Sequence, residues 1–129
     1  VFDQACTLFV PIVEEGWSDT EVARLTAERY LQAFKQEGID TLVLGCTHYP
    51  LLDKTISTVM GPEVELVNPA VNTACKVKEI LEINNQLSEV RVRPTIEFYV
   101  SDFGQGFQKI GSRFLNKEIK AECIDIEGY

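Results

Sequence analysis

A thiol, a hydroxyl and an imidazole stand side by side in the chain, at Cys46, Thr47 and His48. The apolar run Leu42–Leu44 precedes them, and Pro50 follows at a natural first position for a helix. A thiol placed there lies between the carboxyl end of a strand and a helix amino terminus, where open α/β sheets bind their ligands. Free amide donors and the helix dipole favour a thiolate and attract an anionic substrate. The pattern therefore predicts a reactive site.

Each of these side chains also has a structural interpretation. Free cysteines often pack in cores, so Cys46 could simply be buried. Thr47 could cap the following helix instead of offering its hydroxyl and amide to a substrate carboxylate. His48, the only histidine, could be structural rather than assist the thiol or the substrate. Cys46 and His48 could share a metal, but a zinc site would need ligands from unrelated positions, so no metal is expected.

The other cysteines are scattered, at Cys6, Cys75 and Cys123. No Cys-x-x-Cys occurs, which argues against a zinc ribbon or a thioredoxin-type site. Disulfide bonds are not expected in a chain of this size and acidic character. Cys75 falls inside a predicted helix and is interpreted as core or helix surface. Cys6 precedes a helical turn and is less easily dismissed.

Composition narrows the class of protein. The chain has 129 residues, 45% hydrophobic and 25% charged, which suits a globular domain with a real core. A net charge of −8 argues against a nucleic-acid binder. The apolar stretches are too short to span a bilayer and no signal peptide is evident, so we expect a cytoplasmic protein. Because the chain starts with Val1 rather than methionine, we expect it to be part of something longer.

Helical and strand patterns alternate along the chain. A capping box at Ser18–Glu21, with Ser18 as the cap, opens a helix that Gly38 ends. Its apolar positions recur at helical spacing, at Ala23, Ala27, Tyr30, Leu31 and Phe34. Strands are expected over residues 1–6, 40–44, 64–67, 96–100 and 121–126. Further helices are expected over residues 9–15, 50–60, 71–84 and 107–115, with a polar linker at 84–94. The alternation predicts a three-layer α/β/α fold with a mainly parallel sheet.

Four segments together resemble the glutamate racemases. The Cys46 loop, within residues 42–52, resembles the second catalytic motif of that family. Residues 5–16 resemble the entry to its second domain. Residues 66–69 with 72–74, and residues 97–102, resemble later segments in the same order. The similarity covers essentially the whole chain and matches the carboxyl-terminal half of a family member.

The resemblance implies a cofactor-independent enzyme that interconverts L- and D-glutamate by two-thiol proton transfer and supplies D-glutamate for peptidoglycan. It makes Cys46 and His48 catalytic and gives Glu14 an assisting acid–base role; by itself, the pair Glu14 and Glu15 would be interpreted as a solvated helix end. Residues 1–86 would form most of the second racemase domain, and residues 87–129 would be a linker and a segment returning to the first. The partner thiol belongs to the missing amino-terminal half, and a homodimer is possible.

Two other functions stay open at this point. A sibling racemase acting on aspartate or a hydantoin would also use a thiol after a strand. His48 directly after Cys46-Thr47 favours glutamate, because aspartate racemases tend to carry an acidic residue there. A non-catalytic interaction protein built from a racemase fragment is the third interpretation.

Overall fold

The computed structural model describes residues 1–89, 94–102 and 104–128, which belong to two compact units. One unit is Val1–Leu87 and the other is Ser88–Tyr129. This division falls one residue from the boundary expected between residues 86 and 87. The assignment of the two parts to racemase domains stays a prediction.

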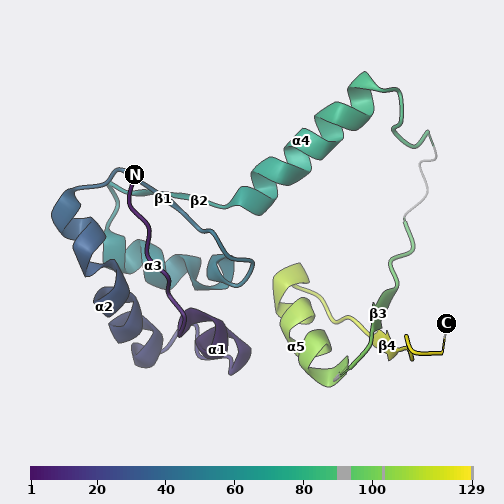
Figure 1. Ribbon diagram of the computed structural model, residues 1–129, viewed down its shortest axis with the longest axis horizontal. Coiled ribbons are helices and arrows are strands. Elements are labelled where there is room, and N and C mark those ends of the chain that lie inside the picture. Colours follow the sequence, from purple (N-terminus) through teal and green to yellow (C-terminus); the bar gives the residue numbers. More distant parts are fainter. Residues whose placement is uncertain (90–93, 103, 129) are drawn as a thin grey trace. The chain divides into compact units, whose positions relative to one another are not determined.

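Helices and strands are mixed along both units (Figure 1). The first unit contains α1 (Phe9–Glu14), α2 (Glu21–Glu37), β1 (Thr41–Val43), the 3-10 helix η1 (Tyr49–Leu52), α3 (Asp53–Met60), β2 (Glu65–Val67) and α4 (Pro69–Ile83). The second unit contains β3 (Phe98–Val100), α5 (Gly104–Leu115) and β4 (Ala121–Cys123). The helix expected over residues 50–60 therefore begins as a 3-10 turn and becomes α-helical from Asp53.

Local signals begin and end α2. Thr20 has an extended backbone, and its hydroxyl accepts a hydrogen bond from a backbone N–H three residues on, at 3.4 Å. Thr20 is therefore the N-cap. The prediction that Ser18 caps this helix is wrong, because a cap must directly precede the first helical residue. Glu21, expected to reach back to Ser18, pairs with Arg24 instead. Gly38 ends the helix with a φ of +63°, as expected, since glycine adopts this left-handed conformation without steric cost.

Three helices of the first unit enclose its hydrophobic core. α2 packs against both α1 and α3. The face predicted for α2 is confirmed: Tyr30 packs against the core, and the residues buried in it are Ala23, Ala27, Leu31 and Phe34. The neighbouring helices contribute the largest fully buried hydrophobic side chains, Phe9, Val13, Leu52 and Ile56. Burial of these side chains supplies most of the stabilisation that this unit can have.

Both strand pairs are parallel. Leu42 lies opposite Leu66 in the pair β1–β2, and Tyr99 lies opposite Glu122 in the pair β3–β4. The parallel pairing expected from the alternating pattern is therefore confirmed, and with it the α/β class. The strand expected over residues 1–6 is wrong, because no strand among the described residues pairs with that segment.

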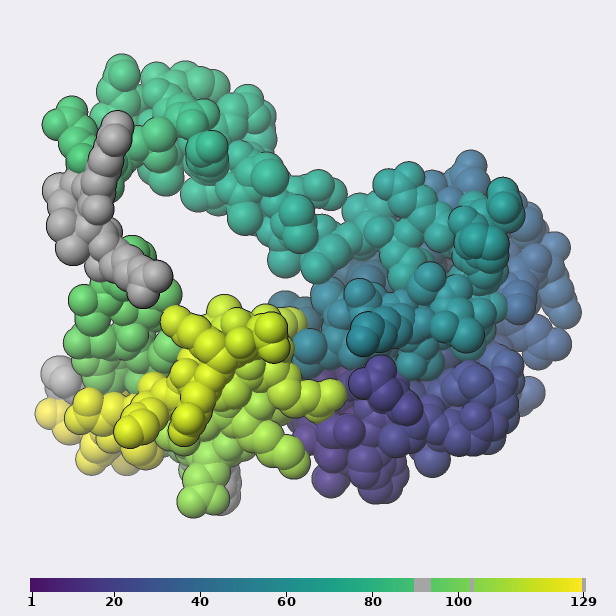
Figure 2. Space-filling model, turned by 180° about the vertical axis from the view of Figure 1, so that it is seen from behind, coloured from purple at the N-terminus to yellow at the C-terminus, as the bar shows by residue number. Residues whose placement is uncertain are grey.

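Helix α4 differs from the other helices of its unit. It is capped normally, since Asn68 Oδ1 accepts a hydrogen bond from the backbone N–H of Ala70 at 3.0 Å. None of its residues is buried, and Figure 2 shows it standing clear of the core of its unit. The residues expected on one side of this helix are exposed or half-buried: Ala74, Val77, Ile80 and Leu81. Their spacing is that of an apolar face, but burial needs a second surface that the described part of this unit does not supply.

The second unit is small. Phe98 of β3 faces Phe107 of α5 with ring centroids 6.0 Å apart, and Gln108 donates a hydrogen bond from its side chain to the Ala121 carbonyl at 3.1 Å. Ile119 is its one buried hydrophobic residue among those described. Of the linker expected at 84–94, residues 90–93 lie outside the described residues. No helix in the described parts of the chain is long and apolar enough to cross a membrane.

Candidate active site

The loop that carries Cys46 connects β1 to η1. Pairing with β2 continues one residue past β1, since the Leu44 N–H donates to the Val67 carbonyl at 3.0 Å. The Cys46 carbonyl then accepts a hydrogen bond from the backbone N–H of Tyr49 at 3.1 Å, and the His48 carbonyl accepts one three residues on. Cys46 is half-buried. These backbone bonds give the loop a defined shape and place the thiol beyond the carboxyl end of the strand, as the sequence predicts.

Thr47 and His48 contact each other through their side chains. The Thr47 hydroxyl lies 3.3 Å from His48 Nδ1. His48, not Thr47, is the N-cap residue of η1, and it makes no side-chain capping bond. Thr47 therefore does not cap the helix, and its exposed hydroxyl orients one nitrogen of the imidazole.

Glu14 reaches the same place from the end of α1. Its Oε1 lies 3.6 Å from His48 Nε2, although 34 positions separate the two residues in the sequence. The imidazole is mostly covered, with 24% of its side chain exposed, whereas the Glu14 side chain is 51% exposed. The imidazole thus has a carboxylate at one ring nitrogen and a hydroxyl at the other. Such an arrangement fixes the orientation of the ring.

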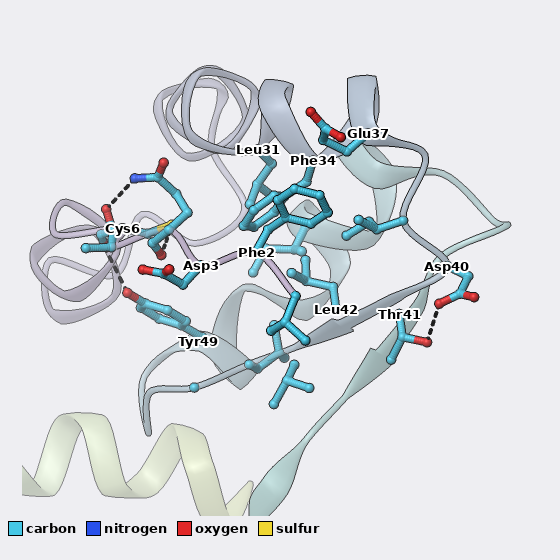
Figure 3. Close-up of a pocket in the computed structure, with 18 of the residues that line it drawn as sticks. Phe2, Asp3, Cys6, Leu31, Phe34, Glu37, Asp40, Thr41, Leu42 and Tyr49 are labelled. Atoms are coloured by element: carbon cyan, nitrogen blue, oxygen red, sulfur yellow. Dashed lines mark hydrogen bonds between the residues drawn. The ribbon is translucent and has the colours of Figure 1, made fainter.

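Tyr49 holds α1 against η1, although no sequence pattern singled it out. Its ring meets Phe9 edge to face with centroids 5.3 Å apart, and its hydroxyl donates to the Cys6 carbonyl at 3.3 Å (Figure 3). Phe9 makes a second edge-to-face contact with Tyr30 at 5.4 Å. Burial raises the pKa of the Tyr49 hydroxyl, so it stays a donor. Its place directly after His48 was a signal, but its partner Phe9 is 40 residues away and no spacing rule connects them.

The remaining cysteines are not part of this cluster. Cys6 is buried, its thiol lies 3.6 Å from the Gln4 carbonyl, and burial raises its pKa from 9.0 to about 11. A thiol with that pKa stays protonated at neutral pH and cannot act as a base. Cys75 on α4 and Cys123 in β4 are exposed. Cys75 is therefore on the helix surface, one of the two positions expected for it. The described residues contain no group of three or more His, Cys, Asp or Glu side chains that could hold a metal ion.

Curated relatives of this chain are glutamate racemases. The protein of Syntrophus aciditrophicus is 48% identical over 119 residues, covering 92% of this chain and 44% of the relative. The "Glutamate racemase 2" of Caldanaerobacter subterraneus is 39% identical over 130 residues, covering 100% of this chain and 49% of the relative. No protein-family model matches the chain.

Solved structures agree with the sequence relatives. The glutamate racemase of Francisella tularensis, crystallised with D-glutamate, superposes with a TM-score of 0.87 at 32% identity, covering 100% of this chain and 48% of that one. The enzyme of Thermus thermophilus, in complex with β-chloro-D-alanine, gives a TM-score of 0.83 at 35% identity, covering 98% of this chain and 48% of that one. The chain has the α/β fold of these proteins and spans about half the length of the relatives it matches. It is a homologue of the glutamate racemases.

Proposed function

We propose that this chain is the carboxyl-terminal half of a glutamate racemase and provides one side of its active site. The observation that carries the proposal is the contact of Glu14 with His48, on the loop of Cys46. The names of the relatives support glutamate as the substrate over aspartate or a hydantoin. The D-glutamate complex of the Francisella tularensis structure supports the same substrate.

Racemisation removes the α-proton of glutamate and returns a proton to the opposite face. The thiolate of one cysteine takes the proton from the α-carbon and leaves a planar carbanion. A thiol on the opposite face then donates its proton to that carbon, so that one thiolate is consumed and another is formed. Two groups tuned near the working pH can exchange these roles in the two directions without a cofactor. Cys46 is the thiol that this chain contributes, and the missing amino-terminal half supplies the thiol on the opposite face.

The neighbours of Cys46 have supporting roles. His48, held between Glu14 and Thr47, moves a proton to or from the thiol or hydrogen-bonds the substrate. The Glu14 carboxylate lies 3.6 Å from the imidazole and holds its orientation. The Thr47 hydroxyl is exposed and is not used for helix capping, which leaves it available to a substrate carboxylate. In this scheme the protein is cytoplasmic, forms D-glutamate for peptidoglycan, and either completes its site with the missing half or pairs as a homodimer.

Alkylation of the native chain tests the role of Cys46. Exposure alone would make Cys75 and Cys123 react first, because Cys46 is half-buried. If the loop activates the thiol, Cys46 takes most of a substoichiometric dose of iodoacetamide, and peptide mapping locates the adduct. Preferential labelling of Cys75 or Cys123 would contradict the proposal.

A neighbouring pair of carboxylates gives a matched control. Glu14→Gln removes the partner of the imidazole, and we expect Cys46 labelling to slow by about threefold or more, the equivalent of losing one partly exposed ion pair. Glu15→Gln changes the same charge one residue away and should leave the rate unchanged. Equal rates for the two variants would remove Glu14 from the scheme.

Racemisation by the chain alone is the second test. With Cys46 on one face and no acid opposite, circular dichroism of L-glutamate solutions should show no inversion. Inversion by this chain, with host enzyme excluded, would refute the need for a second half. It would point to a dimer that shares two copies of Cys46.

A further inference from the structure

Two tyrosines from different elements hold the start of α1. The Cys6 carbonyl accepts the backbone N–H of Phe9 at 3.0 Å and also accepts the hydroxyl of Tyr49 at 3.3 Å (Figure 3). Two residues further on, the Leu8 N–H donates to the hydroxyl of Tyr30, on α2, at 3.2 Å. The helix has no side-chain cap of its own. Its start is therefore held by bonds from residues that are distant in the sequence.

The two tyrosines also share one ring partner. Phe9 meets Tyr30 with centroids 5.4 Å apart and Tyr49 with centroids 5.3 Å apart, both edge to face at an interplanar angle of 86°. Both tyrosines are half-buried. Their contacts with α1 are thus closely matched, and what differs is the element that carries each of them. Tyr30 belongs to α2, which carries no residue of the candidate site, whereas Tyr49 directly follows His48.

The contact between Glu14 and His48 needs such support. The carboxylate oxygen and the imidazole nitrogen are 3.6 Å apart, which is longer than a hydrogen bond, and the Glu14 side chain is 51% exposed. A half-exposed ion pair contributes little and does not hold a loop by itself. Apolar packing of the Tyr49 ring is not directional, whereas its hydroxyl bond fixes both a distance and an angle. This bond is therefore a directional tie between the segment that leads into α1 and the loop that carries His48.

We propose that Tyr49 is a positioning residue, whose hydroxyl bond sets the distance between the His48 imidazole and the Glu14 carboxylate. The inference rests on the proposed function for the use of that pair in catalysis. Tyr30 bonds the same start of α1 from α2, so it holds the helix to its core without setting where the loop lies. The two hydroxyls have different tasks although their contacts are alike.

A matched pair of variants of the 129-residue chain tests this difference. Tyr49→Phe and Tyr30→Phe each remove one hydroxyl and keep the ring on Phe9. We expect urea unfolding midpoints to fall by similar amounts, because each variant loses one hydroxyl from the start of the same helix. His48 is the single histidine, so its ring signals in a proton–carbon NMR spectrum need no assignment. At one fixed pH, Tyr49→Phe should move these signals and Tyr30→Phe should leave them in place.

A double variant separates positioning from other effects on the ring. In the parent chain, Tyr49→Phe should move the His48 signals toward their positions in Glu14→Gln, because both changes weaken the same contact. In a chain that already carries Glu14→Gln, adding Tyr49→Phe should cause less than about half of that movement, since coupled residues are not additive. Equal movement in the two backgrounds overturns the proposal, because Tyr49 would then affect the ring without Glu14. Equal movement by Tyr49→Phe and Tyr30→Phe, or none by either, also overturns it.

The reactivity of Cys46 gives a second readout. We expect Tyr49→Phe to slow its alkylation by about twofold, less than Glu14→Gln does, because the carboxylate is displaced and not removed. Tyr30→Phe should leave the rate unchanged. Equal slowing by the two phenylalanine variants would mean that the loss is one of stability, and it contradicts the proposal.

The NMR signals report on His48 and do not involve the thiol, so the two proposals can fail separately. Signals that respond as expected, in a chain that is labelled first at Cys75 or Cys123, would refute the role of Cys46 alone. Signals that stay in place in Tyr49→Phe, in a chain that is labelled first at Cys46, would refute this inference alone.

Discussion

The two units of this chain have the same kinds of element and bury very different amounts of side chain. In Val1–Leu87 three helices close on one another, and Phe9 and Val13 are at most 1% exposed. In Ser88–Tyr129 a single helix, α5, covers a two-stranded sheet, and none of the described residues of that helix is buried. A parallel strand pair with one helix cannot enclose a core, because burial requires a second layer.

The candidate site stands on the better-packed unit. Glu14 ends α1 and His48 precedes η1, and these two helices are held together through Phe9 and Tyr49. The geometry of the site is thus a consequence of the core beneath it. The second unit and α4 instead expose apolar residues, which indicates surfaces that need a partner.

The largest expected difference between the units concerns their aromatic residues. Phe9→Ala should destabilise the first unit by about 3–5 kcal/mol, since it removes a fully buried ring and leaves a cavity. Phe107→Ala should cost the second unit only about 1 kcal/mol, because that ring is already 42% exposed. Urea unfolding followed by Trp17, the single tryptophan, reports on the first unit, and hydrogen exchange reports on the second. Similar losses for the two variants would show that the units are equally well packed.

Alkaline pH should weaken the first unit. Burial raises the pKa of Cys6 from 9.0 to about 11, so between these values the unfolded chain loses a proton that the folded chain keeps. Stability is therefore complete below pH 9 and falls by roughly 2–3 kcal/mol as the pH rises to 11. The pKa of Tyr49 is also raised, which adds a loss of the same sign. Urea unfolding at a series of pH values measures the slope, and Cys6→Ala should make it shallower; an unchanged slope would exclude Cys6 as its source.

The smallest expected difference in stability between the two units concerns one glycine in each. Gly38 of the first unit has a φ of +63°, so Gly38→Ala should destabilise by about 1–2 kcal/mol although no neighbour crowds the added methyl group. Gly106 lies within α5, also with open space around it, and Gly106→Ala should stabilise the second unit by about 0.5–1 kcal/mol. Thermal unfolding of each variant against the parent tests the two signs. Effects of the same sign would mean that backbone conformation is not what distinguishes these positions.

Much of the molecule follows from local sequence. The buried face of α2, its end at Gly38 and the parallel pairing of β1 with β2 come from periodicity, backbone freedom and the order of elements. The loop from Gly45 to Pro50 is likewise predictable, since a glycine after an apolar run and a proline before a helix are local signals. The prediction of Ser18 as the helix cap was wrong, because Asp19 and Thr20 are also good cap residues. Only the residue at which the helix begins determines which of the three is the cap.

The sequence by itself determined the likeness to the glutamate racemases, most of the helical and strand order, and the residue types that could do chemistry: a thiol, a hydroxyl and one imidazole in a row. The local pattern could not separate Glu14 from Glu15, because adjacent carboxylates at a helix end look alike, and only the resemblance singled out Glu14. Only the tertiary structure shows the contact itself, because the packing of α1 on η1 brings the Glu14 carboxylate to His48. It also decided that Cys6 is buried and that residues 1–6 form no strand. Burial and strand pairing depend on which distant segment lies alongside, and no spacing within the segment specifies that partner.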